Sequence, residues 1–184
     1  MAFPDEPRSF ARPRAYPIGR GSARLALHGI NGAPAMTLDT LRLLEHVHGH
    51  LGVLAAALLV HPAIVLRDRR RRRAHLAVGL ATATVSAGAA LGAWLYVAYR
   101  AELKQQIFTH APSIGLLFER KEHLAFGAVV FAWAGCVAYF AALRATPELR
   151  LALRTIAFRS FAASAALAVV VAVFGVVVAV YKSF

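Results

Sequence analysis

The chain has 184 residues, of which 59% are hydrophobic and 16% are charged, and its mean hydropathy is +0.57. Soluble domains carry nearer a quarter charged residues, so this balance favours a membrane protein over a soluble one. The formal charge of +12 would suit nucleic-acid binding if the basic residues covered a soluble surface. Here they lie in short segments between apolar runs, as in the cytoplasmic loops of membrane proteins. The single cysteine, Cys136, excludes an intramolecular disulfide and a multi-cysteine metal site.

The first 37 residues form a distinct segment, rich in proline, arginine and glycine. This segment lacks the apolar core of a signal peptide. We predict a proline-rich N-terminal tail over residues 1–37, followed by a transmembrane domain over residues 38–184.

The first predicted span, residues 43–66, is largely apolar yet contains four histidines: His46, His48, His50 and His61. About 20 apolar residues in a helix cover the ~30 Å hydrocarbon layer, and ionisable groups within that layer are functional candidates. At about 100° per residue, His46, His50 and His61 fall within roughly 60° of one another, and His48 points elsewhere. One helix face therefore offers imidazoles at two depths, about 16 to 22 Å apart along the axis.

Three further spans are predicted at residues 74–99, 119–143 and 157–180. The second contains the small-residue stretch Gly88–Gly92, whose spacing allows a helix or a flat ligand to approach closely. The connection over residues 100–118 is too apolar for a free loop, and we expect it to lie on the membrane surface. Four spans without a strand pattern predict an all-α protein, an up-down bundle of four transmembrane helices.

Arginine and lysine near the span ends predict the orientation, because charges close to a span weigh most. The links over residues 67–73 and 144–159 are arginine-rich, whereas much of the basic charge on the other side lies in the distant tail. We therefore expect both links in the cytoplasm and both termini outside.

In such a bundle the histidines sort into two levels. His46, His50 and His123 fall near the outer ends of their spans, whereas His61 and His75 fall near the inner ends. Two neutral imidazoles on separate helices are what a bis-histidine haem requires. We predict that His50 or His46 pairs with His123 at an outer haem b, and His61 with His75 at an inner one.

The features that carry a family resemblance are His50 and His61 on one helix face, His75 after the basic link, and Glu122-His123 opening the third span. Through them, residues 40–182 resemble bacterial four-helix b-type cytochromes, in which paired histidines on transmembrane helices bind haem. The resemblance implies an electron-transfer subunit of the bacterial inner membrane that binds one or two b-type haems. It would exchange electrons with a quinone or a redox protein.

Two alternatives stay open. In the first, a Zn, Cu or Fe ion binds the i, i+4 pairs His46–His50 and Glu119–His123 in a single outer site. In the second, the chain binds no cofactor and is an accessory subunit of a larger membrane complex or a homo-oligomer. An enzyme in its own right is not expected, because the sequence contains neither a nucleophile–base arrangement nor a phosphate-binding glycine loop.

Overall fold

The structure, a computed structural model, describes residues 38–67, 74–102 and 104–182, and every element in these ranges is a helix. The predicted tail (1–37) and the arginine run at 69–73 lie outside the described residues. The helices are α1 (Leu38–Arg67), α2 (His75–Glu102), α3 (Lys104–His110), α4 (Pro112–Arg144) and α5 (Pro147–Lys182). The all-α prediction is confirmed for the described ranges.

Four of the helices, α1, α2, α4 and α5, are long and apolar enough to cross a membrane. They contain 30, 28, 33 and 36 residues. At about 1.5 Å per residue, each exceeds the ~30 Å hydrocarbon layer. The described part of the chain thus has four candidate spans, which indicates a multi-pass membrane protein, as predicted.

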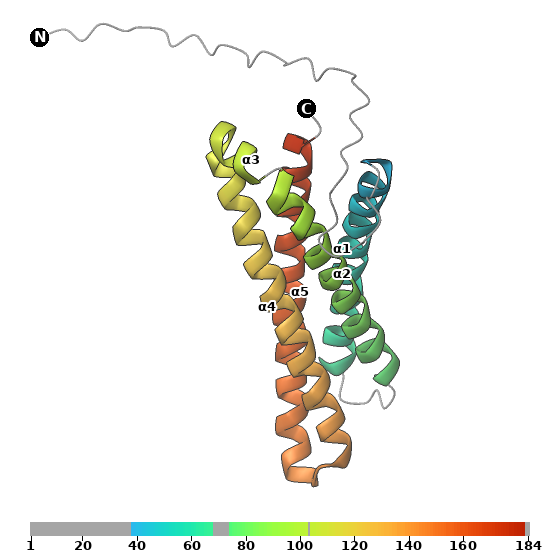
Figure 1. Ribbon diagram of the computed structural model, residues 1–184. Coiled ribbons are helices and arrows are strands. Elements are labelled where there is room, and N and C mark those ends of the chain that lie inside the picture. The colour runs from blue at the N-terminus through green and yellow to red at the C-terminus, as the bar shows by residue number, and fades with distance from the viewer. Residues whose placement is uncertain (1–37, 68–73, 103, 183–184) are drawn as a thin grey trace, which may run out of the picture.

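The four long helices alternate in direction, and each packs mainly against two others (Figure 1). α1 packs against α2 and α5, and α4 packs against α5 and α2, so α1 and α4 lie on a diagonal of the bundle. The starts of α1 and α4, the ends of α2 and α5, and the short α3 share what we call the α3 end. The end of α1, the start of α2 and the turn between α4 and α5 lie at the opposite, hairpin end.

The third and fourth long helices begin earlier than predicted, at Pro112 and Pro147 rather than at residues 119 and 157. Proline suits the first position of a helix, because its fixed φ is helical and its missing N–H would have no partner there. The connection over residues 100–118 consists of the end of α2, the short α3 and the first two turns of α4, and its place on the membrane surface stays a prediction. The Phe108 ring of α3 packs so closely on Gly115 of α4 that an added Cβ would lie 2.8 Å from the ring.

The interior is built mainly from small side chains. Alanines supply much of it, with Leu59, Val78 and the fully buried Phe161 filling the larger spaces. Phe161 of α5 packs on Gly135 of α4, where a Cβ would lie 2.8 Å from the ring. Ser164, also fully buried, donates a hydrogen bond to the Ala128 carbonyl of α4 at 2.7 Å. Small residues bring the backbones close, which is the usual basis of helix packing in membranes.

Candidate functional site: histidines on two faces of α1

The exposed face of α1 carries three of its histidines. His46, His50 and His61 are all exposed, so the prediction that they share one face is confirmed. That face points away from the bundle, because the buried residues of α1 lie on the other side. They are Ala55, Ala56, Leu59, Pro62, Val65 and Leu66.

Backbone hydrogen bonds orient the imidazoles of His46 and His50. Nδ1 of His46 lies 2.7 Å from the Arg42 carbonyl oxygen, and Nδ1 of His50 lies 2.8 Å from that of His46. A carbonyl oxygen can only accept, so Nδ1 carries the hydrogen and donates it. The neutral ring then keeps its lone pair on Nε2, which is the arrangement found in metal-ligating histidines. An open, largely apolar hollow lined in part by Val47 and Leu54 lies beside the two rings.

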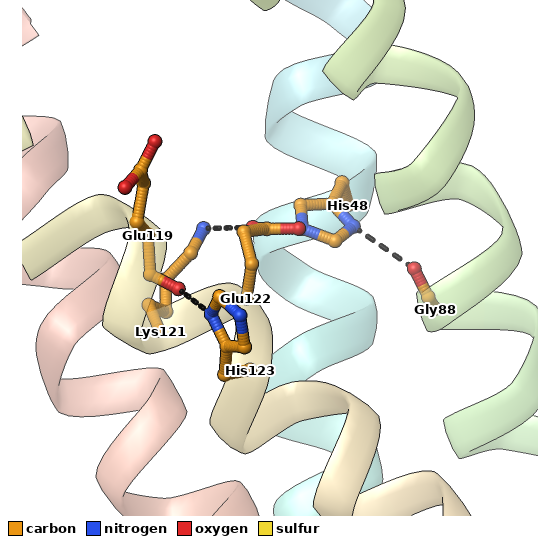
Figure 2. Close-up of polar contacts among 6 residues, drawn as sticks. All are labelled: His48, Gly88, Glu119, Lys121, Glu122 and His123. Carbon is orange, nitrogen blue, oxygen red and sulfur yellow. Dashed lines mark hydrogen bonds and ion pairs between the residues drawn. The ribbon is translucent and has the colours of Figure 1, made fainter.

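His123 on α4 has the same local geometry, with Nδ1 2.8 Å from the Glu119 carbonyl oxygen (Figure 2). It is exposed, however, and α4 lies diagonally across the bundle from α1. Side chains that point outward from diagonal helices do not meet. A single copy of the chain therefore does not bring His123 together with His46 or His50.

The predicted inner pair lies on adjacent helices at the hairpin end. His61 is exposed near the end of α1, and His75 is exposed at the start of α2. Neither imidazole points into the packed interior. Their pairing stays a prediction, and a haem shared by them would lie on the outside of the bundle.

The single-metal alternative required four ligands in one place: His46, His50, Glu119 and His123. Among the described residues, no group of three or more histidine, cysteine, aspartate or glutamate side chains could hold a metal ion. One copy of α1 thus offers at most the two imidazoles of the i, i+4 pair.

His48 is the histidine that turns inward. It is partly buried, and its Nδ1 lies 3.1 Å from the Gly88 carbonyl oxygen of α2 (Figure 2). The ring lies against Gly92, where an added Cβ would come within 2.7 Å of Cε1 of His48. The flat group that approaches the glycines of α2 is therefore an imidazole of the same chain.

Two charged residues of α4 complete the surroundings of His48. Lys121 and Glu122 both act electrostatically on the imidazole, and their own ion pair measures 3.3 Å. In the view of Figure 2 the Glu122 carboxylate lies between the Lys121 ammonium and the His48 ring. His48 thus joins α1 to α2 by a hydrogen bond and reaches across the diagonal toward α4.

An aromatic cluster supports these charges at the α3 end. The Lys121 ammonium lies 4.5 Å from the centroid of Phe118, and that ring stacks on Tyr99 at 3.9 Å. Lys104 of α3 forms an ion pair with Glu119 at 2.6 Å. Hydrogen bonding to Glu119 raises the pKa of Lys104 above its ordinary value, because it stabilises the ammonium form.

The role of His48 was not anticipated from the sequence. The spacing showed only that its direction differs from that of the other three histidines. The available signal was the glycine at 92, whose lack of a side chain leaves room for an aromatic ring.

Comparison of the chain with protein-family models, curated proteins and solved structures finds no match.

Proposed function

We propose that the chain is an electron-transfer subunit of a bacterial inner membrane and that it binds b-type haem through the exposed histidines of α1. The observation that carries the proposal is the lone pair on Nε2 of His50 and His46, directed away from the helix by the Nδ1 hydrogen bonds. His61 adds a third imidazole on the same face, closer to the hairpin end.

The donor chemistry fits haem iron, because neutral imidazole nitrogen is its commonest protein ligand. The position of the donors differs from that in a haem-filled bundle. Alanines, Leu59 and Phe161 fill the space between the helices, so the haem would lie against the outer face of α1. When bound, haem would supply a one-electron centre, and two levels about 16 Å apart would carry an electron part of the way across the membrane.

The chain's own residues would ligate the iron and exclude water from it. Val53, Leu54 and Ala57 lie on the same exposed face between the two levels and would provide apolar contact for the macrocycle. A quinone or a redox protein would exchange the electrons.

The proposed orientation places the hairpin end in the cytoplasm. Arg67, Arg144, Arg150 and Arg159 are all exposed there, which agrees with the enrichment of arginine on the cytoplasmic side. An Arg150→Cys variant in a Cys136→Ser background tests it. An impermeant thiol reagent should label position 150 only after the cells are opened, and labelling in intact cells would reverse the orientation.

The experiment that tests the haem proposal is a reduced-minus-oxidised visible spectrum of the purified protein, produced with ample haem. We expect b-type haem absorbance, and we expect it to vanish in the His50→Ala/His61→Ala double variant. His110→Ala is the matched control, because His110 is an exposed histidine of α3 outside the four candidate spans. The proposal fails if the wild-type protein shows no haem absorbance.

A second candidate function, a cofactor-free accessory subunit, is favoured by the closely packed interior, which holds only one of the described histidines. In that case the chain should be isolated in mild detergent as part of a reproducible larger assembly without haem absorbance. A haem-loaded particle containing this chain alone would exclude it.

A further inference from the structure

We infer that a second copy of this chain supplies the opposite axial imidazoles, so that haem is bound between the α1 helices of a symmetric dimer. This inference rests on the proposed function and names the partner at the same site. Its first ground is the ligand count. A bis-histidine haem needs one imidazole on each side of the macrocycle, and the exposed face of α1 provides imidazoles from one side only.

The chain does not complete the pair by itself at the α3 end. The only other exposed histidine on a long helix at this end is His123, within the described part of the chain, and α4 lies diagonally across from α1. The inward His48 is already hydrogen-bonded to Gly88 and packed on Gly92. The missing ligand must therefore come from outside the copy that provides His50.

Membrane insertion restricts the relative orientation of two copies of the chain. Every copy of one chain inserts with the same orientation, so the two-fold axis of a dimer lies along the membrane normal. In such an isologous contact a residue near the axis meets its own counterpart, and it meets it at the same depth. Two α1 faces in contact therefore place His50 opposite the second His50, and His61 opposite the second His61.

The helical repeat favours these two histidines as the ligands. His50 and His61 are 11 residues apart, which is about three turns, so they differ by only about 20° around the helix. His46 lies about 40° from His50 in the same projection. One line along α1 therefore carries both His50 and His61, and two haems on that line would lie one above the other.

The same face has side chains suited to covering a flat macrocycle. Ala57 is exposed between the two levels, and its small side chain leaves room there. Leu43, Val53 and Ile64 supply exposed apolar area around it. A dimer would also remove the imidazole of His61 from contact with lipid, where an unpartnered polar group is costly.

The first arm of the test is thiol cross-linking in native membranes, in a Cys136→Ser background, with a bis-maleimide long enough to join two helices that have a haem between them. Ala57→Cys places a thiol on the proposed contact face, between the two haem levels. Val130→Cys is the matched control, because Val130 is 48% exposed on α4, away from that face. The reagent should produce a covalent dimer with Ala57→Cys and none with Val130→Cys. A direct disulfide is not expected at position 57, because a haem between the two α1 helices would hold the Cα atoms farther apart than the about 7 Å that a disulfide allows.

The second arm is the haem-to-chain ratio of the purified protein, with its oligomeric state measured by light scattering. We expect a dimer with one haem per chain. His50→Ala and His61→Ala should each halve the ratio, whereas His123→Ala and His75→Ala should leave it unchanged.

The outcomes separate the two proposals. A haem-loaded monomer, or loss of haem in His123→Ala, overturns the dimeric site and leaves the proposed function standing. A cross-linked dimer without haem absorbance in the wild type overturns the proposed function and, with it, the imidazole pairing. Equal cross-linking at positions 57 and 130 shows random collision and overturns the assigned contact face.

Discussion

The inward and outward faces of α1 hold the same side chain in different ways. His48 is fixed by the backbone of a neighbouring helix and lies near the charges of a third. His46 and His50 are fixed only by the backbone of their own helix, so their outer nitrogens remain available. One membrane helix thus uses histidine in two ways: His48 joins it to a neighbouring helix, and His46 and His50 leave a ring nitrogen directed outward.

The largest expected effect on stability comes from truncating a buried phenylalanine, and truncating an exposed one provides the control. Phe161→Ala should lower the free energy of unfolding by about 3–5 kcal/mol, because it opens a cavity at a fully buried position. Phe126→Ala is the control, since Phe126 is 72% exposed on α4. Unfolding in mixed detergent micelles measures both, and equal losses would contradict the division into two faces.

The glycines of α2 provide the next comparison. Gly92→Ala should destabilise the protein by about 1–3 kcal/mol, because its Cβ would overlap the His48 ring. At Gly79 an added Cβ would meet no atom within 4 Å. Gly79→Ala should therefore stabilise α2 by up to about 1 kcal/mol, because alanine has the higher helix propensity. The two unfolding midpoints should therefore move in opposite directions.

A smaller effect is expected from the histidines themselves. His48→Ala should lower the free energy of unfolding by about 0.5–1.5 kcal/mol through loss of the interhelical hydrogen bond to Gly88. His50→Ala should change it by less than about 0.5 kcal/mol when measured without haem, because His50 is exposed. If His50→Ala costs as much as His48→Ala, the outward face contributes to the fold of the single chain.

The smallest effect is expected at the surface ion pair between α3 and α4. Lys104→Met should lower the unfolding midpoint only slightly, because both side chains of the Lys104–Glu119 pair are about one-third exposed. The loss should shrink when unfolding is measured at high salt, which screens exposed charges. A loss that does not depend on salt would show that Lys104 acts through packing on Phe108 instead.

The sequence predicted the fold well and the direction of the faces poorly, for a physical reason. Hydropathy and length are enough to find four spans, and proline and arginine mark their ends. In a bilayer, however, apolar residues suit both the lipid and the interior, so periodicity alone does not say which face is inside. In α1 the small residues Ala55 and Ala56 are buried, whereas the larger apolar residues Val53 and Leu54 are exposed.

The spacing of residues in the sequence could not predict the local geometry of the candidate site. The spacing of His46, His50 and His61 was sufficient to place them on one face. It could not show that Nδ1 of His46 and His50 is hydrogen-bonded to a backbone carbonyl. It also could not show that α1 and α4 lie on a diagonal, because that arrangement depends on how all four long helices pack. The predicted pairing of His50 with His123 assumed two neighbouring helices.

The contact of His48 with Gly92 has an evolutionary consequence. Because the ring occupies the space that a Cβ at position 92 would need, the two positions are not free to change independently. Among related chains, a side chain at 92 should accompany a residue shorter than histidine at 48, and histidine at 48 should accompany glycine at 92. Such paired changes would preserve the rotation of α1, and with it the direction in which the other three histidines of that helix point.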